Sequence, residues 1–141
     1  MNETFIPINN FNKKKWYLID CKKKKLGRLS AIVVLILSGK LKPYYHPSLD
    51  LGDYVILINA KDLLINPAMT KFHVFKPGRP GHSLTKLKDL HNSRILELAI
   101  AKMMPNCLAK SHLSKRLKIY QKTDHPHKAQ NPEQFLNFTH F

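Results

Sequence analysis

The stretch Asp53-Tyr54-Val55-Ile56-Leu57-Ile58-Asn59 decides the fold of this chain. It contains five consecutive large apolar residues, a run that is too short for a helix and rich in β-branched side chains. The segment Asp50-Leu51-Gly52 interrupts the chain before this run, and Asn59-Ala60-Lys61-Asp62 is polar after it. A short apolar run without alternation predicts a strand buried on both faces, in the middle of a sheet covered by helices.

Two elements before this run complete a strand–helix–strand unit. Residues Trp16–Asp20 are aromatic and β-branched and predict a second strand. Residues Leu26–Ser38 place apolar side chains on one face at helical spacing, and Gly39 follows as a C-terminal stop. They predict a helix, although Ile32-Val33-Val34 by itself favours a strand. The unit therefore predicts two parallel strands joined by a right-handed crossover.

The remaining segments are predicted from chain breakers and apolar patterns. The 141 residues fit one domain, with a loose lead-in at 1–12 and an irregular tail at 121–141. Between them we expect an extended loop at 42–47, a strand at 70–75, a loop rich in Pro and Gly at 76–82, a helix at 93–103 capped by Asn92 or Ser93, a short helix at 108–113 and a short final strand at 117–120.

The chain is strongly basic. Lys and Arg number 24 against 9 acidic residues, which gives a net charge of +15. The excess is localised: residues 13–42 hold ten basic side chains and one acid, and residues 71–88 hold five and none. Such a charge destabilises a small domain unless a polyanion neutralises it. We expect nucleic acid as the partner, in preference to an anionic membrane surface or a solvated lysine face.

Other classes of protein find little support in the sequence. Cys21 and Cys107 are isolated, with no zinc or disulfide spacing. Residues 1–12 lack a signal-peptide pattern, and the seven apolar residues Ala31–Leu37 are too few to cross a membrane. We expect a soluble intracellular protein with no cofactor, no metal, no membrane partner and no small-molecule substrate.

Two loops offer chemistry suited to RNA. The glycines of Gly78-Arg79-Pro80-Gly81 let backbone N–H groups approach a phosphate, and Arg79 can bind one in a bidentate manner; the alternative is a plain basic turn. Tyr44 and Tyr45, beside Lys42, can stack on unpaired bases. Trp16 starts a strand, and we expect it in the core.

Two other groups of polar residues suggest chemistry that we do not expect. The pair His125-Pro126-His127 has no third ligand nearby and is a poor zinc pattern, so solvent or RNA contact is favoured. Asp50 and Asp53 could form a catalytic carboxylate pair, but an Asp beside Gly before a buried strand favours a turn former that bonds local backbone N–H groups. No base and nucleophile accompany them, so we expect no enzyme.

Taken together, the chain resembles the universal large-subunit ribosomal protein thirteen family in its bacterial and organellar form. The resemblance runs from Trp16 to about Pro132. It rests on eight fragments in the family's order and spacing: Trp16-Tyr17-Leu18-Ile19-Asp20, Leu26-Gly27-Arg28-Leu29, Gly39-Lys40-Leu41-Lys42-Pro43, Asp50-Leu51-Gly52-Asp53-Tyr54-Val55-Ile56, Ile58-Asn59-Ala60, Gly78-Arg79-Pro80-Gly81, Met103-Met104-Pro105 and Leu117-Lys118-Ile119-Tyr120.

The resemblance implies a three-layer α/β/α fold with a four-stranded, mainly parallel sheet and irregular basic loops and termini. It implies a structural role in the large ribosomal subunit, with large-subunit rRNA and neighbouring large-subunit ribosomal proteins as partners. A plastid location is favoured, with the bacterial cytoplasm as the alternative. The chain departs from the family in its first helix, because Ala31–Leu37 has no charged residue where charges are usual.

We therefore expect a non-enzymatic rRNA-binding protein that supports assembly of the large subunit. The rivals are a free-standing regulatory RNA-binding protein and a small α/β enzyme. Cations and two tyrosines in the basic segments are the expected RNA contacts, made mostly to phosphates. They are Lys22, Lys23, Lys24, Lys25, Arg28, Lys40, Lys42, Tyr44, Tyr45, Lys76, Arg79, Lys86, Lys88, Lys110, Lys115, Arg116 and Lys118.

Overall fold

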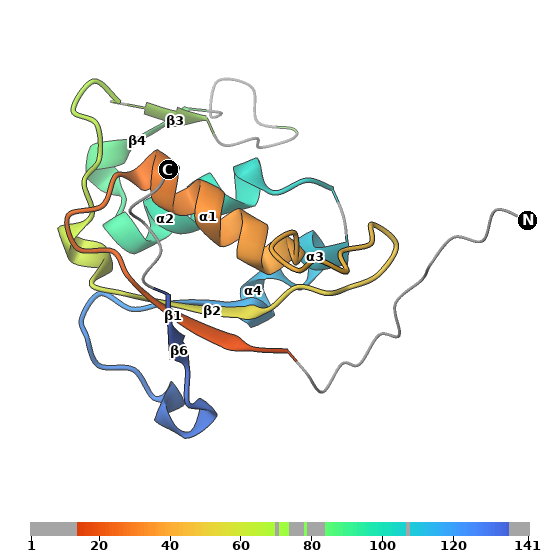
Figure 1. Ribbon diagram of the computed structural model, residues 1–141. Coiled ribbons are helices and arrows are strands. Elements are labelled where there is room, and N and C mark those ends of the chain that lie inside the picture. Colours follow the sequence, from red (N-terminus) through yellow and green to blue (C-terminus); the bar gives the residue numbers. More distant parts are fainter. Residues whose placement is uncertain (1–13, 70, 74–77, 79–83, 107, 136–141) are drawn as a thin grey trace, which may run out of the picture.

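A four-stranded parallel sheet forms the centre of the protein (Figure 1). The computed structural model describes residues 14–69, 71–73, 78, 84–106 and 108–135. The sheet has the order β5 (Leu117–Ile119), β2 (Tyr54–Ile58), β1 (Trp16–Asp20) and β6 (Glu133–Gln134), and every neighbouring pair is parallel. The expected four-stranded sheet in a layered α/β fold is confirmed.

The strand β2 has the central role that its sequence predicts. Val55, Ile56 and Leu57 are fully buried. Successive side chains of a strand point to opposite faces. Accordingly, Val55 and Leu57 belong to the main core beneath the helices, whereas Ile56 is buried outside that cluster. A strand buried on both faces explains why its sequence is a continuous apolar run.

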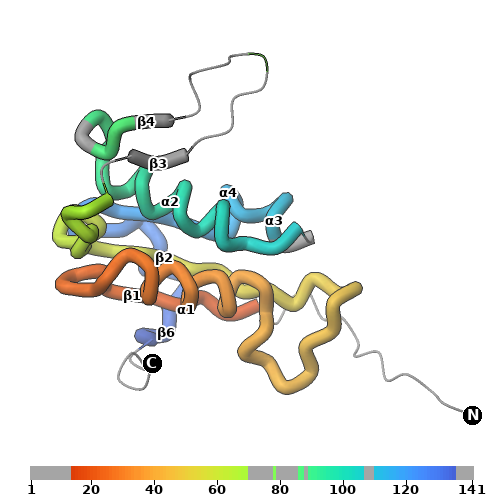
Figure 2. The backbone as a smooth tube through the Cα atoms, turned by 90° about the horizontal axis from the view of Figure 1, so that it is seen from above, coloured from red at the N-terminus to blue at the C-terminus, as the bar shows by residue number. Residues whose placement is uncertain are grey.

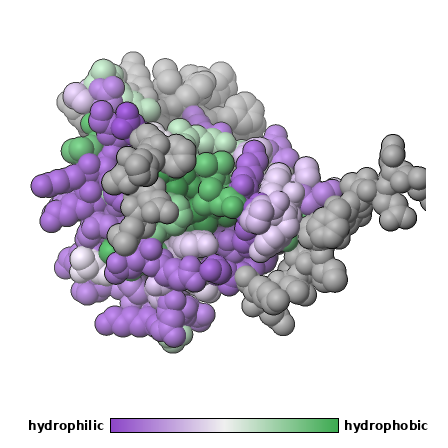
Figure 3. All heavy atoms as spheres, viewed as in Figure 1, coloured by the Kyte–Doolittle hydropathy of each residue, from purple (hydrophilic) through white to green (hydrophobic). Residues whose placement is uncertain are grey.

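The helices α1 (Leu26–Ser38) and α2 (Asn92–Met103) cover one face of the sheet and lie side by side (Figures 1 and 2). The predicted bounds of α1 are confirmed, and it ends at Gly39, whose φ of 78° is left-handed and favours glycine. Figure 3 shows hydrophobic residues gathered where α1 lies, in a mostly hydrophilic face. This agrees with the absence of charge from Ala31 to Leu37.

The opposite face of the sheet is covered by a shorter segment that contains the 3-10 helix η4 (His127–Gln130). The Trp16 ring stacks on Tyr54 with centroids 4.4 Å apart, and His127 lies 5.4 Å from Trp16. The Nε2 atom of His127 is 2.9 Å from the Tyr120 hydroxyl oxygen. Trp16 is therefore half-buried in an aromatic layer and not in the main core, where we expected it. His127 packs within this layer, although we expected it to contact solvent or RNA.

Two strands differ from the prediction. The strand β3 (Lys71–His73), expected at 70–75, pairs antiparallel with β4 (Leu84–Lys86) in a separate two-stranded sheet. The strand β6 lies in the tail that we expected to be irregular, and it continues the main sheet next to β1. Its two polar residues are too few to show a strand pattern. Phe135, which follows the strand, holds it in place: its N–H donates to the Leu18 carbonyl oxygen at 3.0 Å, and its ring contacts the Tyr17 ring.

Shorter segments also differ in detail. The loop at 42–47 turns instead of extending, because the Tyr45 N–H donates to the Lys42 carbonyl oxygen at 3.1 Å. The helix α2 has His91 at its capping position without a side-chain cap, so the expected cap is wrong. Asn92 instead donates to the Lys61 carbonyl oxygen at 2.7 Å and ties α2 to the 3-10 helix η2 (Ala60–Asp62). The remaining elements are the 3-10 helix η3 (Leu87–Asp89) and the helices α3 (Leu108–Ser111) and α4 (Leu113–Arg116). Where one short helix was expected at 108–113, the structure has two, separated at His112.

Candidate nucleic-acid interface

The parallel sheet sorts the basic residues into two groups at opposite edges. At the edge where the strands end (the carboxyl edge), Lys22–Lys25 follow β1, Lys61 follows β2 and Lys122 follows β5. At the edge where they begin (the amino edge), the loop 39–53 leads into β2 and Arg116 precedes β5. The expected RNA contacts therefore do not all lie together.

The carboxyl edge holds its lysines on a well-bonded turn. Asp20 Oδ1 accepts hydrogen bonds of 2.9 Å from both the Lys22 backbone N–H and the Asn59 side-chain amide. The Lys23 N–H donates to the Asp62 carbonyl oxygen at 3.2 Å. These bonds fix the backbone while the side chains of Lys22 and Lys23 stay exposed.

Two further lysines at this edge were missed by the sequence analysis. Lys61 and Lys122 are exposed, and the Asn59 N–H donates to the Lys122 carbonyl oxygen at 3.3 Å. Lys61 lies in a segment of net negative charge, and Lys122 lies in the tail that we treated as irregular. Their position directly after strands β2 and β5 is the signal that could have identified them.

The neighbouring Lys24 differs from Lys22 and Lys23. It is half-buried, and burial lowers the pKa of its ammonium group, although the nearby Asp20 raises it. The Lys24 carbonyl oxygen accepts the Leu64 N–H at 3.0 Å. Lys24 therefore helps to join the two chain segments at the start of α1, where Lys25 and Arg28 are exposed.

At the amino edge, Lys42 and Arg116 point into the fold. The Lys42 Nζ atom is 2.7 Å from Asp53 Oδ1 and 2.8 Å from the Leu51 carbonyl oxygen. The Arg116 side chain is 5% exposed and makes a bidentate pair with Asp50, including a 2.6 Å bond from Nη1 to Oδ1. Because these charges are already neutralised by the buried carboxylate of Asp53 and the half-buried carboxylate of Asp50, we do not assign phosphate contacts to Lys42 or Arg116.

The side chains of Asp50 and Asp53 bind partners that are distant in the sequence. The expectation that they bond local backbone N–H groups in a turn is therefore wrong. Asp50 also pairs with Lys14 at 3.1 Å, and Asp53 Oδ1 accepts the Lys15 backbone N–H at 3.0 Å. Burial by itself raises the pKa of Asp50, but hydrogen bonds from Arg116 and Lys14 outweigh it and hold this pKa at about 2. We call these side chains, with Lys42, the amino-edge ion cluster.

Gly52 lets this cluster close. A Cβ atom at Gly52 would lie 1.9 Å from the Leu37 carbonyl oxygen and 2.8 Å from Arg116 Nη1. Only a residue without a side chain lets the chain before β2 approach the end of α1 so closely. The segment Asp50-Leu51-Gly52-Asp53 is therefore a structural junction between α1, β2 and α4.

Most other expected contacts lie on exposed surfaces. Lys40, Tyr44 and Tyr45 are exposed in the loop after α1, with 48% and 37% of the two tyrosines accessible. Lys86, Lys110 and Lys115 are exposed and Lys118 is half-buried. Lys76, Arg79 and the Gly-rich loop, apart from Gly78, lie outside the described residues, as does the side chain of Lys88.

The described residues do not favour a metal site, a membrane-spanning helix or a reactive thiol. Among them, no three His, Cys, Asp or Glu side chains could hold a metal ion together, and no helix is long and apolar enough to cross a membrane. Burial raises the pKa of the Cys21 thiol to about 12, so it stays protonated at neutral pH.

The fold and its surface define a small, strongly basic protein of the layered α/β class. The family model described as ribosomal protein L13 matches residues 14–126. The chain belongs to the ribosomal protein L13 family.

Similar proteins agree with this assignment. The chain is 51% identical to large ribosomal subunit protein uL13c of Trieres chinensis, over 94% of this chain and 95% of that protein. It is 37% identical to large ribosomal subunit protein uL13 of Cyanothece sp., over 94% and 93% of the two chains. It is 38% identical to uL13 of Dictyoglomus thermophilum, over 94% and 97%. The bacterial and plastid type of the family is therefore confirmed.

Proposed function

We propose that this chain is a structural constituent of the large ribosomal subunit, that it binds large-subunit rRNA and that it supports assembly of the subunit. Its family and the names of its relatives support this role. The 51% identity to uL13c favours a plastid ribosome over a bacterial one. The proposed role is non-enzymatic, with rRNA and neighbouring ribosomal proteins as partners.

The main support comes from the carboxyl edge. Four exposed lysines lie there after three strands that are neighbours in the sheet, β1, β2 and β5: Lys22, Lys23, Lys61 and Lys122. Within the part of the chain that the structure describes, none of the four side chains forms an ion pair. Exposed lysines on a fixed backbone can neutralise phosphates and read the shape of a folded RNA.

The loop after α1 is a second proposed contact. Lys40 supplies a cation, and Tyr44 and Tyr45 expose rings that can stack on unpaired bases. We keep Lys86, Lys110, Lys115 and Lys118 as further phosphate contacts. Lys76, Arg79 and Lys88 stay predictions from the sequence.

The salt dependence of binding tests this proposal. With roughly six phosphates contacted, affinity for a large-subunit rRNA fragment should fall on the order of a thousandfold between 50 and 200 mM salt. Replacing Lys22 and Lys23 together by Ala should make the negative slope of log affinity against log salt shallower by about 1.4–1.8. An unchanged slope in this double variant would remove the carboxyl edge from the interface.

Lys15→Ala is the matched control. Lys15 is also an exposed lysine, but its ammonium pairs with Glu133 at 3.1 Å. Its loss should leave the salt slope nearly unchanged.

The alternative function, a free-standing regulatory RNA-binding protein, predicts that the tagged chain sediments apart from ribosomal subunits in a sucrose gradient. Our proposal predicts that it sediments with the large subunit.

A further inference from the structure

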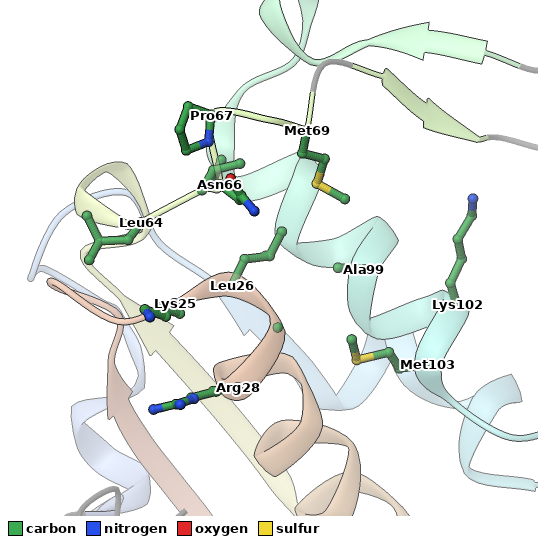
Figure 4. A pocket seen from close by; sticks show the side chains of 12 residues that line it. Lys25, Leu26, Arg28, Leu64, Asn66, Pro67, Met69, Ala99, Lys102 and Met103 are labelled. Atoms are coloured by element: carbon green, nitrogen blue, oxygen red, sulfur yellow. The ribbon is translucent and has the colours of Figure 1, made fainter.

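A groove on the surface is not used by the function proposed above. It has a volume of about 900 Å³ and lies between the start of α1, the segment 64–69 and the end of α2 (Figure 4). Leu26 of α1 faces Ala99 and Met103 of α2 across it, and the segment 64–69 closes its upper side. This volume is typical of sites that bind ligands or side chains of partners.

The groove concentrates exposed apolar side chains. Leu64 is 51% exposed, Met69 39% and Met103 47%, and all three line the groove. They are half of the six large apolar or aromatic residues that are exposed within the described part of the chain. Singly scattered apolar residues are ordinary on a surface, but a cluster around one hollow indicates a binding site.

The rim of the groove is cationic. Lys25, Arg28 and Lys102 line it and are exposed, and the lining residues that the structure describes include no Asp or Glu. The N-terminus of α1 opens here: Lys25 at the capping position makes no side-chain cap bond, and the first turn contains no acidic residue. A helix N-terminus and adjacent cations both favour a negative charge. The occupant should therefore be both apolar and acidic.

The shape and chemistry of the lining favour a protein over an RNA base. Bases usually bind by stacking on aromatic rings, and no Phe, Tyr, Trp or His is found among the described residues that line the groove. Its apolar surface is aliphatic and thioether, and methionine adapts well to the irregular side chains of a protein partner. The groove is also much larger than one flat base needs.

We propose that this groove binds an acidic segment of a partner protein, with one or more large aliphatic anchors in the hollow and flanking carboxylates on Lys25, Arg28 and the start of α1. This interaction does not involve Lys22, Lys23, Lys61 or Lys122, the four lysines to which we assign rRNA binding at the carboxyl edge. It gives a partner protein its own docking site on the chain.

A set of synthetic peptides tests the chemistry of the occupant on the full-length protein. The probe is a fluorescent, helix-forming peptide of about 14 residues with Leu at i, i+3, i+4 and i+7 and Glu elsewhere. One control peptide has Lys in place of Glu, and another has Ser in place of Leu. We expect the probe with Leu and Glu to bind at least about tenfold more tightly than either control peptide. Equal binding of the acidic peptides with Leu and with Ser would reduce the effect to net charge and overturn the proposal.

Variants locate the binding site. Leu64→Glu should weaken binding of the acidic peptide at least about tenfold, and Met103→Glu, on a different element, should do the same. Leu41→Glu is the matched control, because Leu41 is also 51% exposed but lies outside the groove lining. It should leave peptide affinity unchanged. Unfolding curves confirm that each variant is folded, and equal effects of Leu64→Glu and Leu41→Glu would overturn the proposal.

RNA supplies the remaining test. The neutral variant Leu64→Ser should keep wild-type affinity for the rRNA fragment, because it removes no cation and adds no negative charge next to Lys24 and Lys25. A uridine-rich single strand should not compete with the acidic peptide when salt is high enough to suppress phosphate contacts. Competition that Leu64→Glu abolishes would show that the groove holds a base, and the protein partner would be rejected. If the protein failed to bind rRNA but still bound the acidic peptide, the proposed function would be wrong and the groove proposal would remain valid.

Discussion

The two edges of the central sheet use the same cationic residue types in opposite ways. At the amino edge, the buried Arg116 pairs with Asp50 and the half-buried Lys42 pairs with Asp53, and both pairs join separate segments of the chain. At the carboxyl edge, Lys22 and Lys23 are exposed on a turn that backbone bonds and the Asp20 carboxylate hold. The difference teaches that a basic residue contributes to folding where it pairs with a carboxylate inside the fold. Where it has no such carboxylate, it is available to bind a partner.

Removing the carboxylate at the amino edge should have the largest effect. Asp50→Ala leaves Arg116 and Lys14, with side chains 5% and 12% exposed, without their shared partner. An uncompensated buried charge costs about 3–5 kcal/mol of unfolding free energy, measured by urea denaturation. Asp62→Ala, at the exposed carboxyl edge, is the control and should change stability by less than about 0.5 kcal/mol. Similar losses in both variants would contradict the contrast between the edges.

The close approach at Gly52 should give the next effect. Gly52→Ala places a methyl group against the Leu37 backbone carbonyl, and backbone cannot move aside as a flexible side chain can. We expect a loss of about 2–3 kcal/mol, as for overpacking of a core. Gly27→Ala is the matched control: a Cβ there meets nothing within 4 Å, and alanine favours the helix by about 0.5–1 kcal/mol. A stable Gly52→Ala protein would show that the junction is looser than described.

Acid should weaken the amino edge over a defined range. The pKa of Asp50 is about 2 in the folded protein against 3.8 in the unfolded chain. Its folded pKa is depressed, so its contribution is present above pH 4 and is lost as pH falls towards 2. Linkage gives about 2 kcal/mol in total.

Unfolding free energies measured between pH 5 and pH 2 give this contribution by comparison with Asp50→Asn. The variant has no carboxylate to protonate at this position, so its curve should be flatter by about that amount. Parallel curves for the two proteins would mean that Asp50 does not hold this charge network.

The smallest effect on stability should come from the carboxyl edge. Lys23 has a φ of 57°, a left-handed conformation that glycine adopts without strain. Lys23→Gly should therefore stay within about 1 kcal/mol of wild-type stability, because relief of strain and the greater freedom of the unfolded chain oppose each other. Its rRNA affinity should fall, whereas Lys23→Arg should keep it. A large loss of stability in Lys23→Gly would give this lysine a structural role.

The elements with strong local signals were predicted well. The strands Trp16–Asp20 and Tyr54–Ile58 and the helix Leu26–Ser38 were expected at or close to their observed bounds. Each strand is a short apolar run with polar residues after it, and the helix has apolar residues at helical spacing with Gly39 at its end. The strand β6 was missed because its two residues are polar, and only their bonds to β1 make them a strand. The resemblance to the family was correct because it used the order and spacing of whole fragments.

The sequence by itself determined the basic character of this protein, its central strand–helix–strand unit and its family, since these depend on composition and on patterns along the chain. Only the tertiary structure decided which cations are available. Lys40 and Lys42 are two residues apart, yet one is exposed and the other is paired with Asp53. Charge is a property of a residue, whereas burial and ion pairing depend on which distant segments the fold brings together. The groove between α1, the segment 64–69 and α2 arises in the same way, because three separate segments form it.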